Sequence, residues 1–280
     1  MKQSMVVTDL DGTLHYRGDS FSSEVLESLH KLSSLGAIPV IATGRSLYSA
    51  YRVLGRDTPI DYLIFSSGAG IIDWKTQHIV REHTMKTKDV REAALLLHEL
   101  DLEFMIHNPI PENHRFHYFG AGTDNPDFLR RLEYYREFAT PALKSGFIYR
   151  EACQIVVVEN DDGEQSRYEY IANNLESLNV IRTTSPIDGK STWIEIFPST
   201  VSKSLAAEWL RLQCNIPRTR VMAVGNDYND MDLLKWAHRS YVVGNAPDDL
   251  KSRFQNVSVH TENGFSEAVS HWIETEHHRL

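Results

Sequence analysis

The sequence predicts a protein of the α/β class, with a doubly wound parallel sheet and an inserted α/β unit. Short apolar runs alternate with segments of helical periodicity through roughly the first 70 residues, which is typical of strand–helix–strand units. These runs are apolar at nearly every position, as in strands covered on both faces. The same alternation returns after Pro198, whereas the segment between follows another pattern. We therefore expect a Rossmann-like core built from both ends of the chain.

The N-terminal part of the core is expected to contain three strands joined by two helices. Ser22 or Ser23 offers an N-cap to the first helix, and Gly36 is a suitable stop after it. Gly55 follows the second amphipathic segment in the same way. The expected strands are residues 5–8, 38–42 and 62–65, and the expected helices carry Val25 to Leu35 and Leu47 to Leu54.

The middle of the chain predicts a smaller α+β unit. Helical segments at 88–100, 126–138 and 164–178 alternate with strands at 103–107, 114–119, 153–159, 180–184 and 193–197. A turn at 161–163 precedes the third helix. We expect the core to comprise residues 1–82 and 187–280, and the inserted unit to comprise residues 83–186.

After Pro198 the doubly wound pattern resumes. The segment Lys203–Gln213 places Leu205, Ala206, Trp209 and Leu212 on one helical face. The remaining expected elements are strands at 220–224 and 241–243 and helices at 230–237 and 265–273.

Composition argues against several classes of partner. The 280 residues carry a net charge of −9, which repels a nucleic-acid backbone or an anionic membrane. No stretch approaches the roughly 20 apolar residues of a membrane span. Cys153 and Cys214 lie far apart, which favours neither a disulfide framework nor a structural zinc site. We expect a cytoplasmic protein, a monomer or weak homodimer, without nucleic-acid or membrane partners.

Polar clusters follow three of the expected strands and precede one helix. Ligands of open α/β sheets bind beyond the carboxyl ends of the strands, so these clusters should meet in one crevice. The clusters are Asp9 with Asp11, Thr43 with Gly44, Ser66 with Ser67, and Asn226 with Asp227 and Asp230.

The residue types in this crevice point to phosphoryl chemistry. Carboxylate and amide oxygens are the ligands that Mg²⁺ prefers, and packed carboxylates repel one another without a cation. The turns at Gly12 and at Thr43–Gly44 lie where backbone amides favour anions. Lys203 opens a helix, where the dipole disfavours a cation unless an anion is bound there.

Four motifs in order resemble those of the haloacid dehalogenase-like (HAD) hydrolases. Asp9-Leu10-Asp11-Gly12-Thr13-Leu14 resembles motif I, and Ala42-Thr43-Gly44-Arg45 resembles motif II of the Cof-type, sucrose-phosphatase-like branch. Lys203 matches motif III, and Gly225-Asn226-Asp227-Tyr228-Asn229-Asp230 resembles motif IV. The insertion between motifs II and III is similar to a type IIB cap domain.

The resemblance implies a role for each matching residue. Asp9 would be the nucleophile that forms an aspartyl-phosphate, and Asp11 the general acid and base. Mg²⁺ would be held by Asp9, Asp11 and motif IV. The branch more commonly has Asp at position 226, so Asn226 and Asp227 both stay open as ligands, with Asp230 orienting the metal shell. Phosphate oxygens would be bound by Gly12, Thr43, Gly44, Lys203 and Asn229.

The expected activity is a Mg²⁺-dependent phosphatase of small phosphorylated metabolites, sugar phosphates foremost. Two alternatives stay open: a phosphomutase or phosphotransferase with the same motifs, and a non-catalytic regulator that binds sugar phosphates. Residues expected to contact the substrate are Arg45, Ser66, Ser67, Gly68 and, in the cap, His117.

Overall fold

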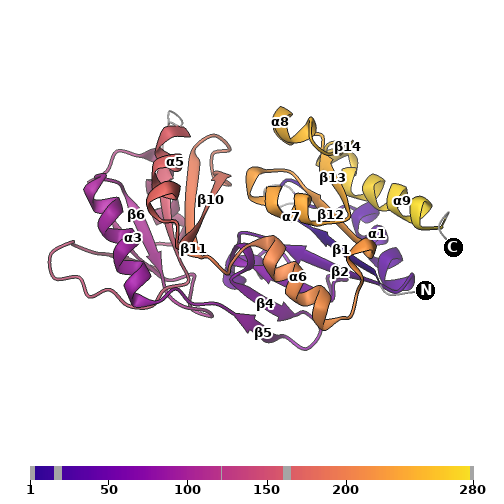
Figure 1. Cartoon of the computed structure of the whole chain (residues 1–280), viewed down its shortest axis with the longest axis horizontal. Helices are drawn as coiled ribbons and strands as arrows, with labels where there is room; N and C mark the ends of the chain where they lie inside the picture. The colour runs from indigo at the N-terminus through magenta and orange to yellow at the C-terminus, as the bar shows by residue number, and fades with distance from the viewer. Residues whose placement is uncertain (1–3, 16–20, 121, 160–164, 278–280) are drawn as a thin grey trace. The chain divides into compact units, whose positions relative to one another are not determined.

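The computed structural model describes residues 4–15, 21–120, 122–159 and 165–277. The chain divides into two compact units (Figure 1). The first, here called the core unit, comprises Met1–Arg81 and Ser202–Leu280, and the second, the inserted unit, comprises Glu82–Val201. The predicted α/β class with an insertion is therefore confirmed. The turn expected at 161–163 lies outside the described residues.

The core unit is built on a sheet that has eight strands within the described ranges, in the order β14-β13-β12-β1-β2-β3-β4-β5. The first six of these are parallel, and β4 joins β3 in antiparallel register. The strands are β1 (Ser4–Thr8), β2 (Ala37–Ala42), β3 (Tyr62–Phe65), β4 (Gly70–Asp73), β5 (His78–Glu82), β12 (Val221–Gly225), β13 (Arg239–Val243) and β14 (Gln255–Val257).

Helices cover both faces of this sheet (Figure 1). Met5 and Val7 of β1 pack with Ala206 and Leu210 of α6 in one cluster, which also holds Leu233 of α7. Helices α1 and α9 pack against each other and cover the other face. The helices are α1 (Ser23–Ser34), α2 (Leu47–Ala50), α6 (Lys203–Gln213), α7 (Met231–Trp236), α8 (Asp248–Lys251) and α9 (Gly264–His277).

The inserted unit has a second sheet, with six strands among the described residues in the order β10-β11-β9-β6-β7-β8. Its pairs are antiparallel except β7 with β8. The elements are α3 (Thr87–Glu99), β6 (Phe104–His107), β7 (Phe116–Phe119), α4 (Pro126–Tyr134), β8 (Ala139–Pro141), β9 (Gln154–Glu159), α5 (Gln165–Asn174), β10 (Leu178–Thr184) and β11 (Thr192–Pro198).

The second boundary of the inserted unit lies later than expected. The expected end at residue 186 falls between β10 and β11, which pair along their whole length from Leu178 with Pro198 to Thr184 with Thr192. Between these strands, Ser185 N–H donates to the Ser191 carbonyl (2.7 Å) and closes a hairpin. The unit therefore ends at Val201.

Three expected helices are shorter than predicted. The second helix of the core ends at Ala50 and not near Leu54, and turns follow it. In the inserted unit, α4 ends at Tyr134, and α5 ends at Asn174 because Leu178 already pairs in β10. In the described part of the chain, no helix combines the length and apolar character needed to cross a membrane.

Candidate active site

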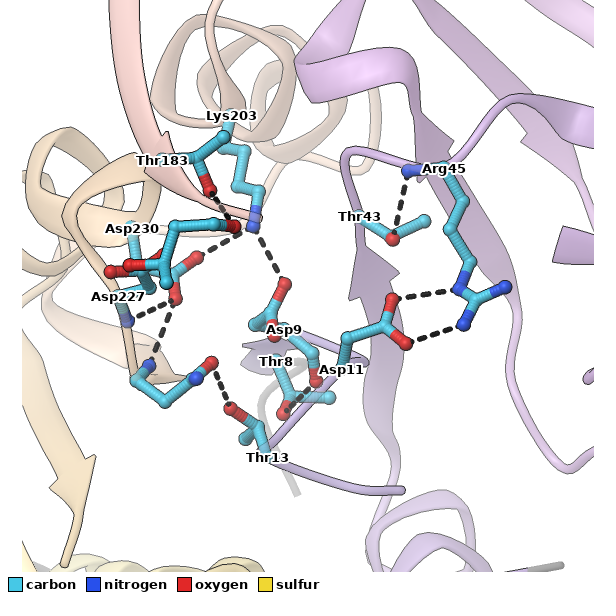
Figure 2. Close-up of polar contacts among 12 residues, drawn as sticks. Thr8, Asp9, Asp11, Thr13, Thr43, Arg45, Thr183, Lys203, Asp227 and Asp230 are labelled. Atoms are coloured by element: carbon cyan, nitrogen blue, oxygen red, sulfur yellow. Dashed lines mark hydrogen bonds and ion pairs between the residues drawn. The ribbon is translucent and has the colours of Figure 1, made fainter. Parts of the chain in front are cut away.

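The predicted convergence of polar clusters is found at the carboxyl ends of the core strands (Figure 2). Asp9 directly follows β1, Thr43 directly follows β2, and Asn226 directly follows β12. These three strands are neighbours or near neighbours in one parallel sheet, so their ends lie at one edge. Lys203 enters the same site from the first turn of α6.

A buried ammonium lies between two buried carboxylates at the centre of the site. Lys203 Nζ donates to Asp9 Oδ1 at 2.7 Å and to Asp230 Oδ1 at 2.6 Å. The three side chains are exposed by 1%, 7% and 0%, respectively. Such a cluster is stable only when its charges face one another, because each ion has lost its hydration.

The electrostatics of this cluster favour an additional positive charge. Burial raises the pKa of Asp9 to about 8, although the ammonium of Lys203 acts in the opposite direction. Burial by itself lowers the pKa of Lys203, but the carboxylates of Asp230 and Asp9 outweigh it, and the pKa is raised. The lysine therefore stays charged, and a proton or a cation is needed to balance the second carboxylate.

Oxygen atoms converge beside this cluster at the end of β12. One end of the Asn226 side-chain amide lies 3.0 Å from Asp9 Oδ2, the Asp11 carbonyl oxygen and Thr13 Oγ1. With the NH₂ group at this position, Asn226 donates to these oxygens; with Oδ1 there, the oxygens of Asn226, Asp9 and Asp11 face one another. Mg²⁺ at about 2.1 Å from each ligand places adjacent ligand oxygens about 3.0 Å apart. The residues therefore fit a hard divalent cation when the Asn226 amide turns its oxygen toward Asp9 and Asp11, and without a cation the NH₂ group takes that position.

Of the five residues expected to hold the metal, Asp227 and Asp230 use their carboxylates for other contacts in the structure. Asp230 Oδ2 accepts from the backbone N–H groups of Asn226 and Asp227, at 2.9 and 3.2 Å, while its other oxygen binds Lys203. Asp227 caps the short turn η3 (Tyr228–Asp230) and forms a capping box with Asp230. Across the described ranges, no three Asp, Glu, His or Cys side chains lie close enough to hold a metal among themselves.

Asp11 is engaged by Arg45 and points away from Asp9 and Lys203 (Figure 2). Arg45 Nε donates to Asp11 Oδ2 at 2.7 Å, and Nη2 donates to Oδ1 at 2.6 Å. The backbone N–H of Arg45 donates to Thr43 Oγ1 at 3.1 Å, which leaves the hydroxyl proton of Thr43 for another acceptor. Arg45 was expected to contact substrate, and in this structure it contacts the other predicted catalytic carboxylate.

Gly12 has a different role from the one predicted. Its N–H, expected to bind phosphate, donates to the His15 carbonyl at 2.8 Å. Its φ of +77° and the approach of Asn226 Nδ2, 2.7 Å from where a Cβ would lie, explain why glycine is required here. Gly12 therefore gives the turn its shape and allows Asn226 to reach the site.

The segment after β3 holds the turn at Thr43 through backbone hydrogen bonds. Ser66 and Ser67 are buried and have φ angles of 48° and 53°, an uncommon conformation for serine. Their N–H groups donate to the carbonyls of Arg45 (2.8 Å) and Thr43 (3.0 Å). With Gly68, they form the turn η1 (Ser66–Gly68), whose contact with substrate stays a prediction. Gly44 and Asn229 are half-buried at the edge of the site, and their binding to phosphate also stays a prediction.

His117 belongs to the inserted unit. It lies on β7, and its ring packs against Phe147 at 5.3 Å between centroids with an interplanar angle of 70°. Its role toward substrate stays a prediction.

Asn245 was missed by the sequence reasoning. Its Nδ2 donates to the Gly12 carbonyl at 2.9 Å, and its Oδ1 accepts from the His260 N–H at 3.0 Å. The residue follows the carboxyl end of β13, so the rule that placed the other polar clusters could have found it.

Comparisons with known proteins agree with this arrangement. The family model described as haloacid dehalogenase-like hydrolase matches residues 6–273. An HMP-PP phosphatase of Yersinia pseudotuberculosis serotype O:1b (strain IP 31758) is 24% identical over 287 residues, covering 96% of this chain and 95% of the relative.

Two solved structures share the fold over almost the whole chain. BT1666 from Bacteroides thetaiotaomicron, described as a phosphatase of the HAD superfamily, superimposes with a TM-score of 0.77 at 19% identity, covering 97% of this chain and 95% of that one. BT4131, described as a HAD subclass IIB sugar phosphatase, gives a TM-score of 0.75 at 16% identity, covering 96% and 98%. At these identities the likeness shows the fold alone.

Proposed function

Because this chain belongs to the family of haloacid dehalogenase-like hydrolases, we propose that it is a Mg²⁺-dependent phosphatase of small phosphorylated metabolites, sugar phosphates foremost. The observation that carries the proposal is the buried cluster of Asp9, Lys203 and Asp230 beside the oxygens of Asp11 and Asn226. The names of an HMP-PP phosphatase and a sugar phosphatase among similar proteins support a small phosphorylated substrate.

In the proposed reaction, Asp9 attacks the phosphorus atom and forms an aspartyl-phosphate, which water then hydrolyses. Oδ1 of Asp9 is bound to Lys203, so the ammonium orients the carboxylate and offsets the charge of an incoming phosphate. Asp230 fixes that ammonium through its own Oδ1. The hydroxyl of Thr43 donates to a phosphoryl oxygen.

Asp11 is assigned the proton transfers. It lies two residues after the nucleophile and would protonate the leaving oxygen, then accept a proton from the attacking water. Asp9, the Asp11 carbonyl and Asn226, with its amide oxygen turned toward them, would hold Mg²⁺, which would neutralise negative charge on the phosphoryl oxygens. Asp227 and Asp230 would stay outside this set, since they are engaged in the turn η3.

The test is phosphate release from sugar, nucleotide and cofactor monophosphates, with Mg²⁺ and with EDTA. We expect release that requires Mg²⁺ and is lost by at least about 1,000-fold in Asp9→Asn. The matched control is Asp57→Asn, an exposed aspartate of the core unit, which should retain full activity. Identification of the organic product separates hydrolysis from transfer to a second hydroxyl.

Either of two results would contradict the proposal. Turnover that survives Asp9→Asn would remove Asp9 as the nucleophile. A phosphorylated isomer as the main product, without free phosphate, would favour the phosphomutase.

A further inference from the structure

The pair formed by Arg45 and Asp11 has the geometry of a strong, specific contact. Its two hydrogen bonds, of 2.7 and 2.6 Å, join two guanidinium nitrogens to both oxygens of one carboxylate. This is the bidentate fork in which arginine best matches a carboxylate. Both Asp11 oxygens are occupied and the carboxylate points away from Asp9 (Figure 2). Held in this way, the carboxylate of Asp11 is directed at Arg45 and not at a leaving group attached at Asp9.

The pair is also open to an incoming ligand. The Arg45 side chain is 25% exposed and that of Asp11 is 32% exposed, in contrast to the buried cluster around Lys203. Arg45 has two further hydrogen bonds. Its backbone N–H donates to Thr43 Oγ1, and its Nη1 donates to Ser49 Oγ at 3.1 Å. The guanidinium can therefore exchange one partner for another without a change in the backbone of the Thr43 turn.

A specific class of group can replace Asp11 on this guanidinium. The fork presents parallel N–H donors that match two oxygens of one oxyanion, whereas a neutral hydroxyl can occupy a single donor. A ligand that takes over the fork must therefore carry a carboxylate or a phosphate in addition to the phosphate that is transferred.

We propose that Arg45 is a latch on Asp11 and determines specificity: a substrate with a second oxyanion in its leaving group takes over the guanidinium and frees Asp11. The inference rests on the proposed phosphatase function and narrows its substrate class. Without such a group, Asp11 stays paired with Arg45 for most of the time and turnover is slow.

Matched substrate pairs test the latch and distinguish the two sources of oxyanion. Glycerol 3-phosphate is compared with 3-phosphoglycerate for a carboxylate, and phenyl phosphate with phenyl diphosphate for a phosphate. We expect kcat/KM of the wild type to be roughly 10- to 100-fold higher for the oxyanion member of at least one pair, as for a hydrogen bond between charged groups. The arm that shows the preference identifies the oxyanion.

Two variants assign that preference to the guanidinium. Arg45→Met should reduce the ratio to about 1, while Arg45→Lys should keep part of it, since an ammonium supplies charge without the fork. Arg52→Met is the matched control, because Arg52 is an exposed arginine of the same segment, and its ratio should equal that of the wild type. Thermal unfolding of each variant verifies that it is folded.

The outcomes separate the latch from the function on which it rests. Release of phosphate from every compound without preference would overturn the latch and leave the phosphatase in place. Equal losses for both members of a pair in Arg45→Met would also overturn it, because Arg45 would then only support the fold. No release from any compound, in the presence of Mg²⁺, would overturn both.

Discussion

Each of the two units buries a cation, and the neighbours of the two cations differ in kind. In the core unit, Lys203 lies between the carboxylates of Asp9 and Asp230. In the inserted unit, the guanidinium of Arg131 lies 4.4 Å from the centroid of Trp193. Its Nε reaches Met105 Sδ at 3.2 Å, and its Nη2 lies 3.3 Å from His107 Nε2.

The pKa shifts of these two cations run in opposite directions. Burial lowers the pKa of Arg131, and the nearby Tyr135, Glu195 and Asp127 only oppose this effect. The carboxylates around Lys203 outweigh burial and raise its pKa. The guanidinium of Arg131 thus packs among aromatic rings, in cation–π contact with Phe116, Tyr135 and Trp193. Lys203 instead lies between two carboxylates, whose combined charge exceeds its own.

The largest predicted effect follows from removal of the core cation. Lys203→Met leaves the carboxylates of Asp9 and Asp230 buried without a counter-ion, and we expect a loss of about 3–5 kcal/mol in the free energy of unfolding. Phosphate release should fall by at least about 1,000-fold, since the nucleophile loses its orientation. Urea denaturation and single-turnover assays measure the two effects. A stable, active Lys203→Met variant would show that the two cations are equivalent.

Removal of the cation of the inserted unit should affect stability alone. Arg131→Met keeps an unbranched side chain of similar length beside Trp193, so we expect a loss of about 2 kcal/mol, as for a desolvated cation–π contact. Phosphate release per folded molecule should match the wild type. If Arg131→Met loses activity to the same extent as Lys203→Met, then Arg131 does not serve stability alone.

His107, beside Arg131 in the inserted unit, leads to a prediction of how the stability of the protein depends on pH. Burial, with the charge of Arg131, lowers the pKa of His107 from 6.5 to about 3. The unfolded chain therefore binds a proton that the folded protein does not, and stability present above pH 6.5 is lost as the pH falls toward 3. The slope is at most about 1.4 kcal/mol per pH unit. Thermal unfolding between pH 7 and pH 4 should show a weaker slope in His107→Gln, and an unaltered slope in His78→Gln, an exposed control.

The smallest predicted effect concerns the amide at the end of β12. Asn226→Asp places a carboxylate 3.0 Å from Asp9 Oδ2 and the Asp11 carbonyl. We expect Mg²⁺ to bind roughly 10-fold more tightly, or about 1.4 kcal/mol, and the metal-free protein to be less stable. Calorimetric titration with Mg²⁺ measures both variants, and Asp227→Asn should bind as the wild type does. Weaker binding in Asp227→Asn would move Asp227 into the metal site.

Much of the core could be predicted from sequence because local signals and burial agree there. The strand 62–65 and the helix 203–213 are predicted to the residue. The buried face of this helix differs from the predicted one, because Ala206, Ala207 and Leu210 are buried whereas Leu205 and Leu212 are exposed. Strands β4 and β5 were missed. β5 alternates exposed with half-buried residues at the edge of the sheet, so it lacks the continuous apolar run of the central strands. The boundary expected at residue 186 divides the hairpin of β10 and β11, because its closing hydrogen bond between Ser185 and Ser191 is not visible in sequence.

The site could be predicted in position and less well in its contacts. The rule for the carboxyl ends of parallel strands places Asp9, Thr43 and Asn226 at one edge of the sheet. Lys203 reaches Asp9 from the first turn of α6. The bonds of Asp11 to Arg45 and of Asp230 to Lys203 depend on side-chain rotamers, which spacing in sequence does not determine. By chemistry Asp227 is a better metal ligand than its neighbour Asn226, and the capping contact that engages Asp227 in the turn η3 is not visible in sequence.

Gly68 has a consequence for protein engineering. A Cβ at this residue would lie 2.2 Å from the Ser202 carbonyl oxygen, so the turn after β3 and the start of α6 meet with no room for a side chain. Ser202 is also the first core residue after the inserted unit. A chimera that exchanges the inserted unit for one from a relative should therefore be joined before Ser202. A junction one or two residues later would replace the surface against which Gly68 fits and would displace Lys203 together with the helix it begins.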